Sequence, residues 1–160
     1  MEIVFVAEQK FELKKIERGF LEVEVPTFIS ETLFDDLQLI EIDRACKKGL
    51  NITYLNNNKI SAKKMSFISI LLYQNINPTL YIDCVLSKKF DDRQLDKIFT
   101  GLLHEVEVEK FAKPDFDYLQ MESILEGMIK GINIDKFLDS DICWLDMKNE
   151  IDYLYHTKFI

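Results

Sequence analysis

The sequence predicts an all-α fold, an α-solenoid of about six repeats in which a long helix, a turn and a short helix follow one another. Two observations predict it: an apolar column recurs along the chain, and helix-start signals recur in the same register. The column has spacings of 26, 26, 30, 26 and 26 residues and consists of Leu13, Leu39, Met65, Leu95, Met121 and Met147. We expect a single α-helical repeat domain over residues 1–160, with repeats starting near residues 8, 34, 60, 90, 116 and 142. Its first and last repeats are expected to be degenerate caps.

Two further columns complete the buried face expected of each long helix. Three residues after the first column stand Ile16, Ile42, Ile68, Ile98, Ile124 and, as the exception, Glu150. Seven residues after it stand Phe20, Cys46, Leu72, Leu102, Met128 and Leu154. Apolar residues at i, i+3 and i+7 form one face of a helix, so Leu102 and Met128 are expected to be buried between repeats. A small residue precedes the last column in four repeats, which predicts a close approach of a neighbouring helix: Gly19, Ala45, Gly101 and Gly127.

The helix starts share one pattern of capping residues. Asp35, Asp91 and Asp117 are each followed three residues later by a glutamine, which predicts an N-cap with a capping box. Ser61 takes the cap position in the third repeat, where Lys64 replaces the glutamine. Together with the apolar columns, these signals predict long helices near residues 12–22, 35–48, 62–74, 91–104, 117–130 and 144–155. Glycine C-caps are expected after two of them, at residues 49 and 131.

A shorter element follows most of the long helices. Residues 49–55 align with residues 131–138, and residues 75–81 and 105–111 fall in the same register. Asparagines 51, 77 and 133 are expected to cap short helices there. The run Glu105-Val106-Glu107-Val108 alternates like a β-strand, but its alignment with the asparagine-capped copies favours a short helix. Residues 19–29 match residues 101–112 after deletion of one residue, so the same pattern is expected in a degenerate first repeat.

This order of capping, apolar and glycine residues resembles short α-helical repeats of about 26 residues in uncharacterised proteins of low-GC Gram-positive bacteria and their phages and mobile elements. The resemblance covers roughly residues 11–155. It is strongest over residues 90–141 and weakest in the third repeat, which lacks the glycine and has four extra residues near 83–89. It implies the helical repeat fold and no particular activity.

Charge and composition restrict the functional classes. The formal net charge is -8, with sixteen acids against eight bases in residues 90–160 and four bases against one acid in residues 61–89. Duplex binding needs a row of cations facing phosphates, so we expect a protein partner, with a basic or nucleic-acid-binding surface, and no direct nucleic-acid binding. Short apolar runs predict no membrane span, and an N-terminus without a basic lead-in predicts no signal peptide. Three cysteines, odd in number and far apart, indicate a reduced, cytoplasmic location.

No constellation of residues indicates catalysis, a metal site or a cofactor. His104 and His156 fall at a polar position in the last helical turn, and Cys46, Cys84 and Cys143 have no partner at catalytic or metal-binding spacing. The aspartate pairs at 35–36 and 91–92 recur at helix starts, where capping accounts for them. We therefore expect a protein that is not an enzyme. A hydrolase that uses surface carboxylates is the enzymatic alternative, and a divalent metal in the purified protein would favour it.

The candidate partner-binding residues lie in two regions. The acids of the fourth and fifth repeats form either a solvated face with caps or a negative strip along neighbouring short helices: Glu105, Glu107, Glu109, Asp135 and Asp139. The basic third repeat adds Tyr73, Tyr81 and Lys88, either as a contact surface or as sequence drift. The predicted function is a non-catalytic protein-binding repeat module. The narrower alternative is a phage or mobile-element inhibitor that blocks a host nucleic-acid-handling defence protein, such as a CRISPR effector, through the acidic strip.

Overall fold

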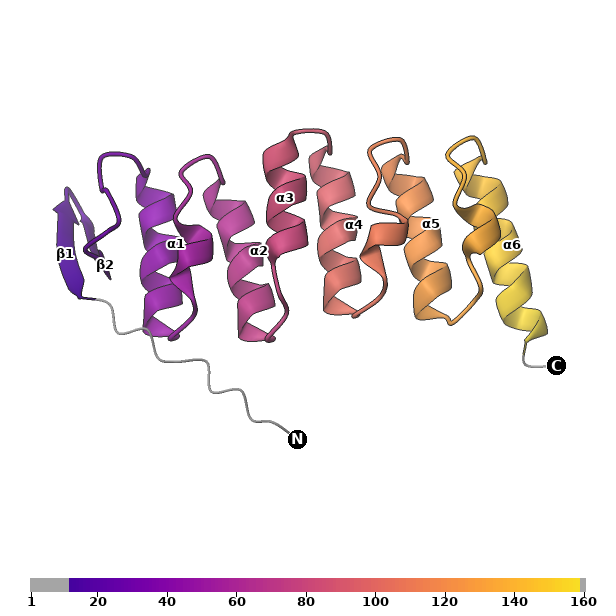
Figure 1. Ribbon diagram of the computed structural model, residues 1–160, viewed down its shortest axis with the longest axis horizontal. Helices are drawn as coiled ribbons and strands as arrows, with labels where there is room; N and C mark the ends of the chain where they lie inside the picture. The colour runs from indigo at the N-terminus through magenta and orange to yellow at the C-terminus, as the bar shows by residue number, and fades with distance from the viewer. Residues whose placement is uncertain (1–11, 159–160) are drawn as a thin grey trace. The chain divides into compact units, whose positions relative to one another are not determined.

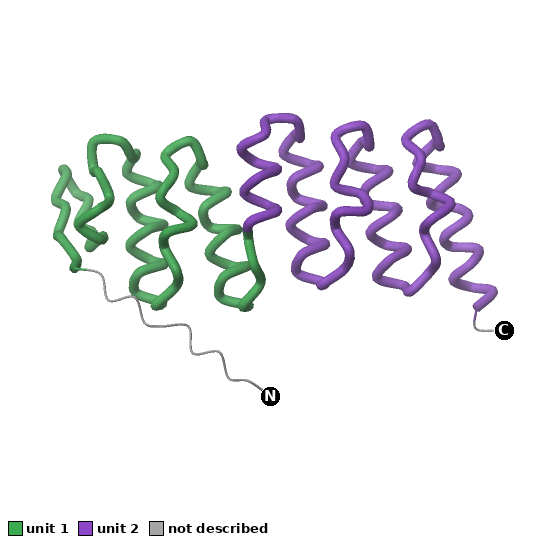
Figure 2. The backbone as a smooth tube through the Cα atoms, viewed as in Figure 1, with its two compact units in different colours: residues 1–78 green, residues 79–160 purple. Residues whose placement is uncertain are grey.

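The computed structural model describes residues 12–158, and the N-terminal segment considered for a signal peptide lies outside them. The strands are β1 (Leu13–Arg18) and β2 (Leu21–Pro26). Six α-helices follow in the described chain (Figure 1): α1 (Asp36–Lys47), α2 (Ala62–Tyr73), α3 (Thr79–Ser87), α4 (Asp92–Leu103), α5 (Tyr118–Ile129) and α6 (Trp144–Thr157). The 3₁₀ turns are η1 (Ile52–Leu55), η2 (Val108–Lys110) and η3 (Asp135–Phe137). The chain divides into two compact units, residues 1–78 and 79–160 (Figure 2).

The expectation of an all-α solenoid is wrong. The helix expected over residues 12–22 is absent, because β1 and β2 pair there as a two-stranded antiparallel sheet. The fold is therefore a mixture of helices with a small sheet. Within the sheet, Arg18 pairs with Leu21 across a two-residue turn, and Gly19 takes a φ of +62° there. Two-residue hairpins favour a glycine with positive φ in the turn.

The hairpin is stable because its apolar residues share one face. Ile16, Val23 and Val25 are buried, whereas the alternating Glu22 and Glu24 are exposed. The backbone N–H of Glu24 donates to Asp43 Oδ1 at 3.0 Å, which fixes β2 against α1. Alternation of this kind suits a strand with one face on the core. Phe20, in the turn, is fully exposed and contributes nothing to the core.

The other five long helices are confirmed to within two residues at each end. Asp35, Asp91 and Asp117 are N-caps, and each forms a complete capping box with the glutamine three residues later. Ser61 precedes α2 but makes no side-chain cap bond. Lys64 cannot replace the glutamine in a box, because an ammonium group has no acceptor for the backbone N–H of the cap. No helix in the described part of the chain is long and apolar enough to cross a bilayer.

The short elements are single 3₁₀ turns after α1, α4 and α5. In the third repeat, the four extra residues lengthen the element into the nine-residue helix α3. The segment Glu105–Val108 forms no strand in the structure, which agrees with the expectation of a short helix, since η2 begins at Val108. Each 3₁₀ turn buries one or two apolar side chains, including Ile52, Val108 and Phe137.

The glutamines of the capping boxes also connect consecutive repeats. Each is buried, and its side-chain amide donates to two backbone carbonyls that lie 20 and 22 residues later. Gln38 Nε2 lies 2.7 Å from the oxygen of Ile60, Gln94 Nε2 lies 2.6 Å from that of Phe116, and Gln120 Nε2 lies 2.8 Å from that of Ile142. The acceptor in each case immediately precedes the next N-cap. We call these contacts the glutamine clasps. They fix the start of one long helix to the start of the next within a unit.

The first two apolar columns form the core, with Leu13 exposed as the exception in the first and Glu150 as the exception in the second. The expectation that Leu102 and Met128 are buried is wrong, because both are only half-buried. The residue before each is buried instead, since the following 3₁₀ turn packs there. A Cβ atom on Gly101 would lie 2.9 Å from side-chain atoms of Val108 and Phe111. The small residue therefore does allow a close approach, although the neighbour is a 3₁₀ turn.

Candidate functional site

The candidate site lies in the second unit, where α4 and α5 end. Both helices end in a Schellman motif. After α5, the N–H of Gly131 donates to Met128 and that of Ile132 to Gly127, at 3.0 and 2.9 Å. After α4, the N–H of Glu105 donates to Leu102, and that of Val106 donates to Gly101 at 3.2 Å. Each motif turns the chain sharply and holds the next residues beside the helix end.

These two chain reversals enclose an open groove of about 430 Å³, which we call the acidic groove. Its apolar lining comes from Val106, Met128, Ile132 and Ile134. Its polar lining comes from Glu105, Glu107, Lys110, Asn133 and Asp135. The first three of the apolar residues are half-buried, so part of each remains accessible. The groove thus combines an accessible apolar floor with three carboxylates.

One lysine partly balances these carboxylates. Lys110 Nζ lies 2.9 Å from Glu107 Oε2 and 3.7 Å from Asp135 Oδ1. The hydrogen bond that Lys110 donates to Glu107 is the main reason that the pKa of Lys110 is raised above its ordinary value. Both acids keep about 70% of their side-chain surface exposed, at 72% for Glu107 and 69% for Asp135. The groove therefore keeps a negative excess that a cationic group from outside can reach.

Glu105 occupies an unusual backbone position. Its φ is +55°, in the left-handed region, at the site where Gly49 and Gly131 end the helices α1 and α5. A side chain in this conformation costs about 1 kcal/mol or more, because Cβ approaches the following carbonyl. Strained positions that persist in a structure are frequently functional. A carboxylate is therefore kept in the acidic groove where glycine would suit the backbone better.

The remaining candidate residues lie outside the acidic groove. Glu109 and Asp139 are exposed, and Asp139 Oδ1 accepts the N–H of Asp141 at 2.9 Å. In the third repeat, Tyr73 is exposed beneath Lys48 Nζ, which lies 5.8 Å from its ring centre. Lys88 is also exposed, just after α3. The structure therefore brings together Glu105, Glu107 and Asp135 but not the whole acidic series.

Tyr81 is a correction to the expected contact surface. It is fully buried in α3, and its ring meets that of Phe99 edge-on with centroids 6.0 Å apart. Burial raises the pKa of its hydroxyl above the ordinary value, and Asp96 and Asp92 raise it further. In the nine-residue helix, Tyr81 falls on the same face as the buried Cys84 and Val85. Its role in the structure is to fill the core of the second unit.

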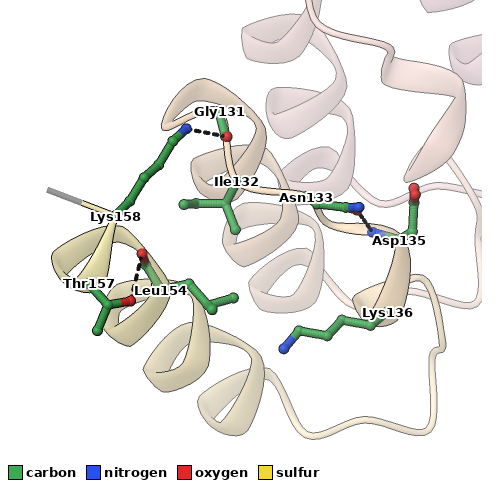
Figure 3. Close-up of a pocket in the computed structure, with 8 residues that line it drawn as sticks. All are labelled: Gly131, Ile132, Asn133, Asp135, Lys136, Leu154, Thr157 and Lys158. Atoms are coloured by element: carbon green, nitrogen blue, oxygen red, sulfur yellow. Dashed lines mark hydrogen bonds between the residues drawn. The ribbon is translucent and has the colours of Figure 1, made fainter. Parts of the chain in front are cut away.

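A second groove, which we call the C-terminal groove, adjoins the acidic one (Figure 3). It has a volume of about 600 Å³, and it shares Ile132, Asn133 and Asp135 with the acidic groove. Its other lining residues come from η3, the end of α5 and the last turns of α6: Gly131, Lys136, Leu154, Thr157 and Lys158. Lys158 Nζ donates to the carbonyl of Gly131 at 2.9 Å, and Lys136 pairs with Glu150.

The cysteine, histidine and aspartate side chains that were considered for catalysis occupy positions that the fold accounts for. Burial, followed by the charge of Asp43, raises the pKa of the Cys46 thiol to about 11, so it is a poor nucleophile at neutral pH. His104 is the C-cap of α4, and both it and His156 are exposed, as the repeat register predicted. Asp35 and Asp91 are caps. Within residues 12–158, no group of three or more histidine, cysteine or acidic side chains is placed to hold a metal ion.

The acids of the acidic groove are visible in the sequence, but the apolar linings of the two grooves are not. The repeat pattern places Met128, of the acidic groove, and Leu154, of the C-terminal groove, in the expected core, and it places Ile132 in a short helix. The signal that could have found them is the position of the third column, in the last turn of each helix. A single 3₁₀ turn covers less surface than a full helix, so it leaves the last turn of the preceding long helix partly exposed.

No family model, curated protein or solved structure matches this chain.

Proposed function

We propose that this chain is a non-catalytic protein-binding module that holds a basic segment of a partner protein in the acidic groove. The observation that supports this most is the accessible apolar floor beside three carboxylates and one lysine. Apolar surface supplies most of the free energy of association, and complementary charge gives orientation and a faster encounter. A segment with lysine or arginine next to apolar side chains matches both properties.

The charge of the groove favours a protein over a nucleic acid. Phosphates would meet Glu105, Glu107 and Asp135, and the lysine that lines the acidic groove, Lys110, is already paired with Glu107 and Asp135. Nucleic-acid affinity requires cations that replace phosphate counterions. A basic protein surface has the opposite requirement and gains from the same three carboxylates.

We place this function in the cytoplasm. All three cysteines, which lie within the described residues, are thiols and none forms a disulfide. Cys143 is exposed, and an exposed thiol is best preserved in a reducing compartment.

The test is recovery of a partner by matched variants of the protein. Cells that make the protein are used for affinity purification with the wild type and with Glu105→Lys/Glu107→Lys/Asp135→Lys, followed by mass spectrometry and titration of the purified partner. The control, Glu109→Lys/Asp115→Lys/Asp141→Lys, makes the same change of charge at exposed acids outside both grooves. We expect the groove variant to lose the partner and the control to retain it. Loss by both variants, or by neither, would place the interface elsewhere.

A narrower candidate is an inhibitor of a nucleic-acid-handling defence protein. It is favoured by one observation: Glu107 and Asp135 belong to consecutive repeats, and both contact Lys110. Acids from successive repeats therefore lie close together on one surface, where they can occupy a groove that is shaped for phosphates. Competition between the protein and a DNA duplex for the recovered partner distinguishes this candidate from the general one.

A further inference from the structure

We propose that the partner segment is a narrow, extended chain that crosses from the acidic groove into the C-terminal groove, with basic side chains in the first and a carboxylate-bearing side chain at Lys158 in the second. This inference rests on the proposed function. It adds the path of the segment and the charge order along it.

The two grooves form one path because they share a wall. Ile132, Asn133 and Asp135 line both of them. Figure 3 shows Ile132 and Leu154 pointing into the C-terminal groove, with Asn133 and Asp135 on the side where η3 begins. A flat protein surface would meet only the rims of two adjoining hollows. A narrow segment can lower one side chain into each of them.

Each groove offers an apolar position on its own side of Ile132. Met128 contributes to the acidic groove, and Leu154 contributes to the C-terminal groove. They stand at the same place in two consecutive repeats, seven residues after Met121 and Met147. Both are half-buried, so each retains apolar surface that a partner side chain can cover. Two apolar side chains of the segment would therefore occupy equivalent positions in successive repeats.

The charges differ between the two ends of the path. The acidic groove contains Glu105 and Glu107 beyond the shared Asp135. The C-terminal groove instead contains Lys136 and Lys158. Lys136 is paired with Glu150, whereas Lys158 Nζ donates to a neutral carbonyl, that of Gly131. An ammonium group has three N–H donors, so Lys158 can bind a carboxylate while it keeps that bond.

Synthetic peptides of about ten residues test the charge order, measured by fluorescence anisotropy with the full chain. All have one composition, with two leucines, three lysines and three glutamates among neutral residues. Two peptides carry the lysines and glutamates in separate blocks, in either order, so that both directions of the bound chain are tested. In the third, the charges alternate. We expect one block peptide to bind at least about threefold more tightly than the alternating one, since each complementary rim pair contributes a fraction of a kcal/mol. Equal binding of all three, or binding by none, would overturn the proposal.

Variants of the C-terminal groove test the path. Lys158→Glu should weaken the favoured block peptide by at least about threefold, while Lys89→Glu, an exposed lysine outside both grooves, should leave binding unchanged. If Lys158→Glu has no effect while the acidic-groove variant abolishes binding, the proposed function stands and the extended path is wrong. If the acidic-groove variant retains its partner, the proposed function itself fails.

Discussion

The side-chain amide of Gln120 donates to the backbone carbonyl of Ile142 at 2.8 Å, and its oxygen accepts the backbone N–H of Asp117 at the same distance. One buried side chain thus completes the cap of α5 and fixes the chain that leads into α6. A third bond goes to the carbonyl of Ser140 at 2.7 Å. Gln38 and Gln94 repeat this arrangement in the same register.

Loss of this clasp should destabilise the protein. Gln120→Leu leaves a cap N–H and two carbonyls without their side-chain partner, and each unsatisfied buried group costs about 1–3 kcal/mol. We expect urea denaturation to show a loss of at least about 1 kcal/mol in the free energy of unfolding.

Gln120→Glu separates the two roles of this residue. Glutamate still accepts the cap N–H, but its carboxylate faces two carbonyl oxygens. Burial near these acceptors should raise the pKa of the new carboxyl group. The loss of stability should therefore be largest at neutral pH and shrink below about pH 4, where the unfolded chain is protonated too. A variant as stable as the wild type at pH 7 would show that only the capping box matters.

Gly127→Ala should destabilise the second unit, although alanine is normally the better helix former. The added Cβ would lie 2.9 Å from Ile134 Cγ2 and 3.2 Å from Ile151 Cδ1. Overpacking of this kind costs about 1–3 kcal/mol. Thermal melting should show a lower midpoint. An unchanged or higher midpoint would mean that η3 and α6 move apart easily, and that the contact at Gly127 does not limit their packing.

Met121→Ala and Met128→Ala should differ in their effect on stability. Met121 is fully buried, so its truncation should cost about 2–5 kcal/mol. Met128 lines the acidic groove and is half-buried, so its truncation should cost clearly less and should weaken partner binding. Denaturant titration of both variants makes the comparison. Equal losses of stability in the two variants would mean that the third apolar column, which contains Met128, belongs to the core.

Glu105→Gly should make the protein more stable and weaken its binding. Glycine adopts a φ of +55° without the Cβ conflict, so the free energy of unfolding should rise by up to about 1 kcal/mol. The acidic groove loses one of its three carboxylates in the same change. Glu105→Ala is the control, because it removes the charge and keeps the strain. If Glu105→Gly gains stability without any loss of partner affinity, the strain at Glu105 has no functional role.

Acid should remove the contribution of a charge network between α5 and α6. Lys130 Nζ lies 2.6 Å from Glu126 Oε1 and 2.9 Å from Asp152 Oδ1. These bonds from Lys130 are the main reason that the pKa values of both carboxyls are lowered from 4.5 and 3.8. Their stabilising effect is therefore present above those values and is lost as the pH falls below them.

The comparison variant is Glu126→Gln/Asp152→Asn, which keeps the shape of both side chains. Its melting temperature should lie slightly below that of the wild type at pH 7, because Glu126 and Asp152 are both partly exposed. The difference should close towards pH 3. A difference that does not change with pH would mean that the network contributes through packing alone.

The capping signals were readable from sequence because they are local. An aspartate and a glutamine three residues apart satisfy backbone groups within one helical turn, whatever surrounds them. The fold class was not readable in this way, as one repeated motif shows. Residues 22–25 and residues 105–108 are both Glu-Val-Glu-Val, yet the first run is a strand and the second leads into a 3₁₀ turn.

The context of each copy decides between these structures. The first follows the Gly19–Phe20 turn and has a strand to pair with, as in the pairing of Glu24 with Lys15. The second begins where α4 ends, and the bond from Val106 to Gly101 turns the chain before any pairing is possible. The acids of the groove could be found in the sequence because charge density is visible there. Their gathering around Met128 depends on how closely η2 packs on Gly101, and spacing alone does not reveal that.

The glutamine clasps recognise only backbone carbonyls on the receiving side. Every residue type carries such an acceptor, so the clasp itself places no requirement on the side chain of the receiving residue, as long as the chain keeps its path. A duplicated block of 26 residues that begins with a capping box would bring its own glutamine donor and meet a backbone acceptor at the start of the next block. Gene-level copying can therefore alter the number of blocks in one step, without a second compensating substitution, and the side chains of each new loop are open to selection for a new partner.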